Sequence, residues 1–134
     1  MKSFKFEIDT PYRQFFSDEV QAVTLTLLDG DITVYADHSF FTAPVMAGVV
    51  SLKGVDGVWK NAFISEGILE VKTFNKYLLV DAAEWPEEID RERAEKALAA
   101  AEETISVGTF RFETAAAEAA ARRARYRIKV ADLS

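Results

Sequence analysis

Apolar and polar residues alternate along the first two thirds of the chain, and this alternation predicts a series of short β-strands. Phe4, Phe6 and Ile8 are separated by charged residues, which is the period of two expected of a strand with one buried face. Pro11 marks the end of this first strand. The same alternation recurs at residues 23–27, 32–34, 58–64, 69–71 and 78–82.

Short segments rich in Gly, Asp, Asn and Ser separate the predicted strands. They lie at residues 29–31, 53–57, 65–67 and 75–76. Such residues favour turns, and no segment with a helical period lies between them. We therefore expect residues 1–84 to form an N-terminal domain, an antiparallel β-sandwich of about ten strands.

The hydrophobic period changes to about 3.6 after Trp85 and Pro86, which predicts helices. A first helix is expected to end near Gly108, with Thr109 as the N-cap of a second. Together they predict an αα-hairpin over residues 85–134. The inward stripe of the first helix is predicted to contain Ala94, Ala97, Leu98, Ala101 and Ile105. That of the second is predicted to contain Phe112, Ala116, Ala119, Arg123, Tyr126 and Val130.

Alanine dominates the predicted hairpin, because twelve alanines lie between Ala94 and Ala124. Alanine favours a helix strongly, but each inward alanine contributes only about 0.8 kcal/mol per methyl-sized group buried. The hairpin is therefore expected to hold together weakly and to dock weakly on the sandwich. This composition fits a movable element, and it fits a permanently docked hairpin equally well.

Composition and charge exclude several classes of protein. Hydrophobic residues make up 49% of the chain, which supports a real core, and the net charge of −6 argues against a nucleic-acid partner. With no cysteine and one histidine, the chain has neither a thiolate nor a multi-histidine metal site. No run approaches roughly 20 apolar residues, so direct membrane insertion is not expected. No phosphate-loop, nucleophile-elbow or dinucleotide motif is present, and we expect no catalytic residues.

The junction between the two predicted domains carries the most informative polar residues. Residues 89–94 read Ile-Asp-Arg-Glu-Arg-Ala. Asp90 is suited to accept the free N–H groups of a first helical turn, while Ile89 packs back on Ala94, so a helix should start at Asp90. Arg93 places a cation one turn later. The segment is therefore either a small polar recognition site or only a helix cap with a solvated arginine.

Two segments resemble the epsilon subunit of bacterial F-type ATP synthases. Residues 65–71, Ser-Glu-Gly-Ile-Leu-Glu-Val, are similar to the family's Gly-Gly-Ile-Leu-Glu-Val strand, and residues 89–94 to its Ile/Leu-Asp-x-x-Arg-Ala nucleotide motif. The resemblance extends over essentially the whole chain. It implies a non-catalytic subunit at the foot of the central stalk, peripheral to the cytoplasmic face of the bacterial membrane and bound to the gamma subunit and the c-ring.

The resemblance also implies regulation by the hairpin. In the family the hairpin can extend toward the alpha and beta subunits and block ATP hydrolysis. Several members bind ATP at the folded hairpin, which favours the non-inhibitory state. ATP is therefore the expected regulatory ligand, and no metal ion is required.

The resemblance and the chemistry of ATP together nominate a binding site on the folded hairpin. The adenine needs a hydrogen-bond acceptor and an apolar shelf, and the phosphates need cations. Cations near a helix C-terminus also suit the helix dipole or an acidic partner, and this explanation stays open for all bases of the last helix, including Arg122, Arg125 and Lys129. The candidates are Glu84, Ile89, Asp90 and Ala94 for the adenine and Arg93, Arg123 and Arg127 for the phosphates.

The chain departs from the family in two places. Residues 33–41, Thr-Val-Tyr-Ala-Asp-His-Ser-Phe-Phe, keep His38 but lack the glycine and both prolines of the family's Gly-Val/Ile-x-Pro-x-His-x-Pro segment. The turns near Gly30, Asp31 and His38 are the expected contacts with the stalk and the ring. Ala100 stands where some ATP-binding members have an arginine, which is expected to weaken the affinity for ATP.

An alternative from another functional class rests on aromatic residues. Tyr35, Trp59 and Trp85 are candidates for stacking on sugar rings, which suits a free-standing small-ligand or carbohydrate-binding β-sandwich with a structural hairpin. Packing in a core or an interface is the simpler explanation for two tryptophans. Recovery of gamma and c subunits together with the chain distinguishes these functions.

Overall fold

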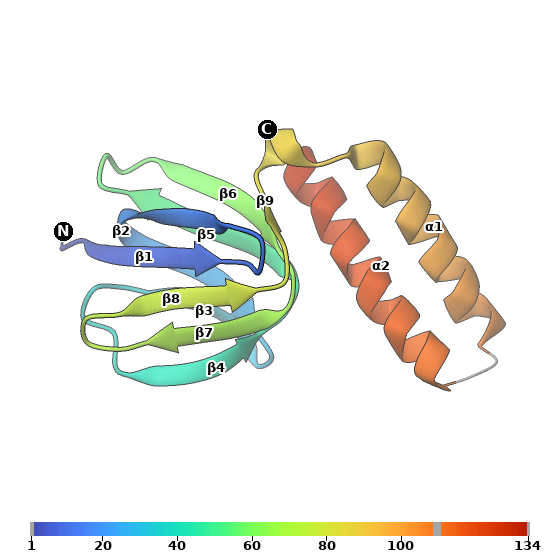
Figure 1. Cartoon of the computed structure of the whole chain (residues 1–134), viewed down its shortest axis with the longest axis horizontal. Helices are drawn as coiled ribbons and strands as arrows, with labels where there is room; N and C mark the ends of the chain where they lie inside the picture. Colours follow the sequence, from blue (N-terminus) through green and yellow to red (C-terminus); the bar gives the residue numbers. More distant parts are fainter. Residues whose placement is uncertain (1, 109–110, 134) are drawn as a thin grey trace.

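The structure is a computed structural model that describes residues 2–108 and 111–133, with no side chain described at position 112. Within these residues nine strands form a β-sandwich, and a short 3-10 helix leads to two helices that lie side by side (Figure 1). The strands are β1 Phe4–Asp9, β2 Gln14–Leu27, β3 Gly30–Val34, β4 Phe41–Val45, β5 Gly48–Gly54, β6 Trp59–Ile64, β7 Gly67–Val71, β8 Lys76–Val80 and β9 Ala83–Glu84. The helices are η1 Pro86–Glu88, α1 Arg91–Val107 and α2 Arg111–Ala131.

The long strand β2 connects the two layers of the sandwich. Its first part pairs with β1, and its second part pairs with β3 and β5. One layer has the order β1-β8-β7-β4, and the other continues from β2 through β5 and β6 to β9. β1 and β8 run parallel, so the prediction of an antiparallel sandwich is wrong for this pair. The two strands are far apart in the chain, and no hairpin forces them to be antiparallel.

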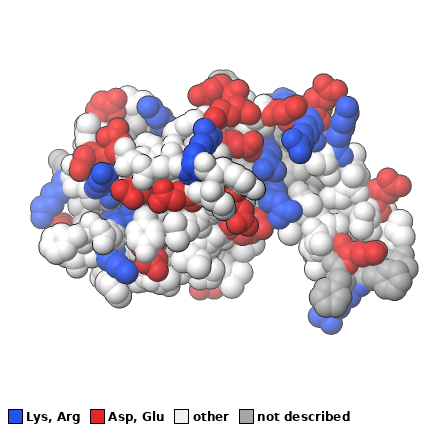
Figure 2. Space-filling model, in the orientation of Figure 1, with Lys and Arg blue, Asp and Glu red and all other residues white. Residues whose placement is uncertain are grey.

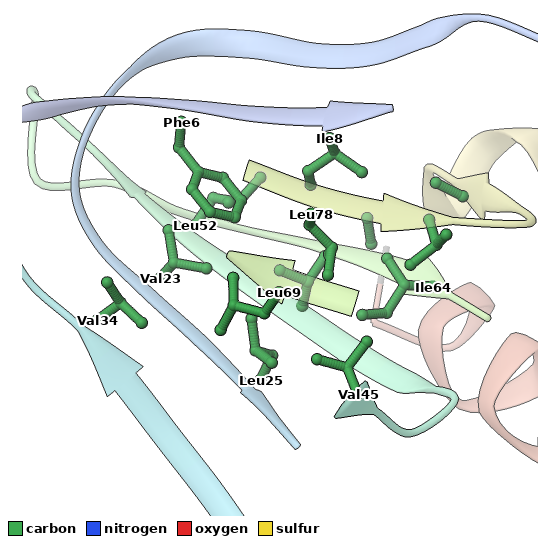
Figure 3. Packing of buried hydrophobic residues seen from close by; sticks show 14 of the residues in the cluster. Phe6, Ile8, Val23, Leu25, Val34, Val45, Leu52, Ile64, Leu69 and Leu78 are labelled. Carbon is green, nitrogen blue, oxygen red and sulfur yellow. The ribbon is translucent and has the colours of Figure 1, made fainter. Parts of the chain in front are cut away.

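Apolar side chains from both layers meet in the core of the sandwich (Figure 3). Phe6 and Ile8 of β1, Leu25 of β2, Leu69 of β7 and Leu78 of β8 belong to this core, and each is at most 1% exposed. The alternation on which these strands were predicted is therefore confirmed. Burial of each large side chain contributes about 1.5–3 kcal/mol, so the sandwich has a strong hydrophobic driving force of its own.

The alternation fails at β6 and β9. Val58, which was predicted to point inward, precedes β6 and is 54% exposed, whereas the last three residues of β6 are buried in succession. Of these, Ala62 and Ile64 belong to the core, and Phe63 contacts the hairpin on the other side of the strand. A strand covered on both sides loses its polar face. At β9, the alternation predicted that Ala82 would be buried, but Ala83 is buried instead.

The alternation also missed β4, β5 and the first half of β2. β4 contains Pro44, which cannot donate a ladder hydrogen bond, but β4 meets β2 only at Leu27 and otherwise pairs with β7 alone. β5 begins and ends with glycine, a residue that is depleted in strands and weakens the signal. The described residues contain nine strands, and about ten were expected. The prediction therefore erred mainly in where the strands lie and less in their number.

Asp90 begins α1 as predicted. Its Oδ1 accepts a hydrogen bond from the Arg93 N–H at 3.1 Å. The helix ends after Val107 because Gly108 adopts a left-handed conformation, with a φ of 59°, and donates its N–H to the Thr104 carbonyl. Both ends of the first predicted helix are confirmed, whereas the predicted N-cap Thr109 lies outside the described residues.

The buried faces of the helices differ partly from the predicted stripes. Ala97 and Ala116 were predicted to face inward and are exposed, and Ala119 is only half-buried. A single stripe cannot describe α2, because this helix packs against α1 on one side and against β5 and β6 on another. The predicted contribution of the Phe112 side chain lies outside the described residues. The buried apolar residues of the described hairpin are Ala94, Ala101, Ala117, Ala121, Ala124 and Val130.

The hairpin docks on the sandwich through α2, and α1 lies on the far side of α2 (Figure 1). The Arg122 Nε–H donates to the Ala47 carbonyl at 2.8 Å, just before β5. The Arg127 guanidinium lies over the Phe63 ring, 4.4 Å from its centroid. The structure thus shows the docked form of the hairpin. Within the described residues, no helix is both long enough and apolar enough to cross a membrane.

We expect residues 1–86 to fold without the hairpin. The largest fully buried side chains of the described residues all lie in the sandwich, while the buried residues of the hairpin are alanines apart from Val130. A chain that ends at Pro86 should keep the near-ultraviolet circular dichroism of its aromatic residues, with the full-length chain as control. Loss of that signal would show that the hairpin is needed to hold the sandwich together.

Candidate functional site

A groove of about 420 Å³ lies where the start of α1, the second half of α2 and the linker after β9 meet. Its volume is in the range of small-ligand sites. Six of the seven predicted binding residues line it, from segments far apart in the chain, and Ile89 does not. The lining residues are Glu84, Glu88, Asp90, Arg93, Ala94, Ala97, Ala120, Arg123, Ala124 and Arg127.

One end of the groove offers a hydrogen-bond acceptor beside an apolar wall. Asp90 uses Oδ1 to cap α1, and its Oδ2 has no hydrogen bond to a described residue, so this oxygen is available to a ligand. Ala94, one turn along α1, faces the groove, together with Ala120 and Ala124 of α2. Ile89 instead donates its N–H to the Pro86 carbonyl at 3.3 Å and closes η1.

Arg127 is paired with another residue of the groove. Its Nε–H donates to Glu84 Oε1 at 2.6 Å, and each of these side chains is 29% exposed. The guanidinium also stacks on Phe63 of β6, so Arg127 contacts two strands of the sandwich at once. Glu84 was predicted near an adenine; in the structure it orients the cation. The pair therefore belongs both to the groove and to the docking surface of α2.

The other two arginines of the groove differ in their partners. The Arg123 NH1 group donates to Glu66 Oε2 at 3.0 Å, in the turn between β6 and β7. Arg93 forms no ion pair with any residue that the structure describes. Glu66 was missed by the sequence analysis, because nothing local links a β-turn to a helix 57 positions away.

The groove combines both signs of charge. Three guanidinium groups and three carboxylates line it. Figure 2 shows basic side chains gathered where the hairpin meets the sandwich, with acidic side chains next to them. Such a site suits a ligand with an anionic end for the arginines and a hydrogen-bond donor for the free oxygen of Asp90. In the described part of the chain no cluster of three His, Cys, Asp or Glu side chains could hold a metal ion.

Glu88 fixes the linker at the edge of the groove. Its Oε1 accepts hydrogen bonds from the Arg13 guanidinium at 2.9 Å and from the Trp85 N–H at 2.9 Å. Arg13 also donates to the Ala83 carbonyl at 3.3 Å. The hydrogen bond from Arg13 holds the pKa of Glu88 below its usual range. The Arg13–Glu88 ion pair is therefore fully formed near neutral pH and is lost as the pH falls through the lowered pKa.

The remaining bases of α2 serve other contacts. Arg122 binds the Ala47 carbonyl and lies over the Tyr126 ring, 5.0 Å from its centroid. Arg125 pairs with Glu102 of α1 at 3.8 Å. The simple explanation that these bases only suit the helix dipole is therefore incomplete, because Arg122 and Arg125 have specific partners.

The turns predicted to face the stalk and ring lie outside the groove. Gly30 has a φ of 127°, which favours glycine, and lies two positions after the exposed Leu28. Asp31 Oδ1 accepts a hydrogen bond from the Thr26 hydroxyl at 2.7 Å. The His38 ring lies 5.0 Å from the Phe41 ring, measured between centroids. Asp31 and His38 each have a contact within their own part of the sandwich.

The aromatic residues do not form one platform for a sugar. Trp85 stacks on Phe15, with ring centroids 4.6 Å apart, and also contacts Phe16. Trp59 is at the start of β6 and Tyr35 follows β3, and each is about half exposed. Trp85 is thus explained by packing where the linker leaves the sandwich.

Comparisons with known proteins agree with both halves of this architecture. The family model for the β-sandwich domain of the ATP synthase delta/epsilon chain matches residues 3–86. The model for the long α-helix domain of the same chain matches residues 87–132. The ATP synthase epsilon chain of Caldanaerobacter subterraneus subsp. tengcongensis is 44% identical over 131 residues, covering 97% of this chain and 94% of that relative. The epsilon chain of Caldicellulosiruptor bescii is 39% identical, with 98% and 96% covered.

The fold also recurs in a solved assembly. A chain in the cryo-EM structure of the Euglena gracilis mitochondrial ATP synthase, which contains OSCP, F1 and the c-ring, superposes with a TM-score of 0.82. The two chains are 22% identical, and the match covers 98% of this chain and 82% of that chain. This structural likeness shows a shared fold, and the sequence matches show the family. The chain therefore belongs to the family of ATP synthase delta and epsilon chains.

Proposed function

We propose that the chain is the epsilon subunit of an ATP synthase central stalk, with a coupling role and no catalysis of its own. The family match over residues 3–132 supports this role, and the similar chains carry the epsilon name. The sandwich binds the gamma subunit and the c-ring and so lies peripherally at the cytoplasmic face of the bacterial membrane. The assembly in which the fold recurs contains F1 and a c-ring, which supports these partners.

The hairpin is the regulatory part of this subunit. Docked, as in the structure, it leaves ATP hydrolysis free; extended, it reaches the alpha and beta subunits and inhibits. ATP is the ligand that favours the docked form. The observation that carries this proposal is the groove, because it joins an acceptor at Asp90, an alanine wall and three arginines from α1 and α2. A nucleotide in this groove contacts both helices and the linker. It therefore stabilises the docked form of the hairpin and not the extended form.

The energies involved allow ATP to act as the switch. The docked helix buries mainly alanines, and its ion pairs are partly exposed, at about 0–1 kcal/mol each. A ligand at one hundred times its dissociation constant stabilises the state it binds by about 2.7 kcal/mol. A gain of this size changes the ratio of docked to extended hairpins by about a hundredfold.

The stalk role is tested at Asp31, beside the turn between β2 and β3, and at His38. Asp31→Lys and His38→Trp should each lower ATP-driven ion pumping by the reassembled enzyme, because a blocked contact near the centre of an interface costs about 2 kcal/mol or more. Thermal unfolding of the isolated variants should change little, because Asp31 is exposed and loses only its hydrogen bond with Thr26, and His38 lies in a loop. Asp56→Lys, in the turn between β5 and β6, is the charge-matched control. Undiminished pumping in both variants would remove these turns from the interface.

A further inference from the structure

Glu66 stands on a turn that is fixed on both sides. Before it, the Ser65 N–H donates to the Ala82 carbonyl at 2.9 Å, and the Ser65 hydroxyl accepts the Ala82 N–H at 2.8 Å. After it, Gly67 packs so closely on Leu79 that a Cβ at this position would lie 1.9 Å from the Leu79 carbonyl oxygen. The backbone at Glu66 is therefore held rigidly against the end of β8 and the segment that follows.

The carboxylate of Glu66 reaches across to the docked helix. It accepts a hydrogen bond from Arg123 at 3.0 Å, with side chains 46% and 33% exposed respectively. Arg123 lines the groove, but Glu66 does not. Glu66 lines a separate hollow of about 540 Å³, which also contains Asp9 and Asp81. The Arg123 guanidinium thus lies between the groove and an acidic surface of the sandwich.

This position differs from that of the Arg127 pair. Glu84, the partner of Arg127, is itself part of the groove wall, where it is available to a nucleotide. Glu66 cannot contribute such a contact from the neighbouring hollow. A phosphate that approaches Arg123 either displaces Glu66 from the guanidinium or stays close to its negative charge. Both outcomes oppose anion binding, because an ion pair is lost or like charges are brought together.

We propose that Glu66 is an internal competitor of the nucleotide phosphates for Arg123. This inference rests on the proposed nucleotide function of the groove. With the groove empty, the Glu66–Arg123 pair helps to hold α2 on the sandwich. When nucleotide binds, its phosphates take over Arg123. Glu66 therefore strengthens docking without ligand, weakens the affinity for ATP, and raises the ATP concentration at which the hairpin responds.

The test compares Glu66→Gln with Asp81→Asn in the full chain. Glutamine keeps the size of the side chain and removes its charge, so ATP should bind about two- to fivefold more tightly in calorimetry. Without nucleotide, the backbone amides of α2 should exchange with solvent about two- to fivefold faster. Asp81→Asn removes the same charge from the same hollow but breaks no ion pair with α2, and both readouts should stay near their wild-type values.

Each outcome bears on the inference. Tighter ATP binding and faster α2 exchange in Glu66→Gln alone support it. Unchanged ATP affinity overturns it while the nucleotide function stands, provided that the wild-type chain binds ATP. Weaker binding overturns it as well, because Glu66 then positions Arg123 for the phosphates. If neither chain binds ATP at millimolar nucleotide, the inference and the proposed function fall together.

Discussion

Phe63→Ala is expected to release α2 from the sandwich while the sandwich stays folded. Phe63 is 0% exposed, and its ring lies under the Arg127 guanidinium. Its neighbours Ala62 and Ile64 belong to the core, but Phe63 does not, so its loss removes contacts mainly from the docking surface. Truncation of a buried phenylalanine costs about 3–5 kcal/mol. This cost is large for a hairpin whose other docking contacts are alanines and partly exposed ion pairs.

Hydrogen exchange measured along the chain checks this expectation. The backbone amides of α2 should exchange at least about a hundredfold faster than in the wild-type chain. The amides of β1, β7 and β8 should keep their wild-type exchange rates. Trp59→Ala is the matched control, because Trp59 lies on the same strand and is 47% exposed. Protected α2 amides in Phe63→Ala would show that the hairpin does not depend on this surface. Collapse of the near-ultraviolet signal would place Phe63 in the core instead.

Asp90→Asn and Arg127→Ala are each expected to weaken ATP binding by about tenfold or more. Asparagine can still cap α1 through its carbonyl oxygen, but its NH₂ group replaces the free acceptor Oδ2 with a donor. Arg127→Ala removes a phosphate cation, and a hydrogen bond to a charged group contributes about 1.5–3 kcal/mol. In the assembled enzyme both variants should shift the balance toward inhibition of ATP hydrolysis.

Arg91→Ala is the control for these two variants. Arg91 pairs with Glu95 and Asp132 on the face next to the groove and is not part of its lining. Calorimetry on the isolated chain should give it the wild-type affinity. An equal loss of affinity in all three variants would indicate general destabilisation of the hairpin rather than loss of ligand contacts.

The strands with one buried face could be predicted from the sequence, and those with two could not. β1, β7 and β8 alternate because one side meets the core and the other meets water. In β6 the docked α2 covers Phe63, so the burial pattern depends on contacts with a helix that lies far along the chain. The stripe of α2 was misplaced for the same reason, because this helix contacts both α1 and the sandwich.

The candidate site was predictable only where its residues are close in the chain. Asp90 and Arg93 share one helical turn, and Arg123 and Arg127 share one face of α2, so local spacing shows both pairs. The partners of the two α2 arginines come from the sandwich. Glu66 contacts Arg123 from outside the groove, and the Arg13–Glu88 pair holds the linker at its edge; both interactions arise from long-range packing, for which a single sequence has no local signal.

Calorimetric titration of ATP into the full-length wild-type chain tests the account most directly. The groove joins Asp90, the alanine wall and the three arginines only while the hairpin is docked, so binding of ATP reports that arrangement in solution. We expect a saturable isotherm with a single ATP per chain, reached at or below millimolar nucleotide. No binding at millimolar ATP would contradict the account, because Asp90 would then be only a helix cap and the arginines only docking contacts.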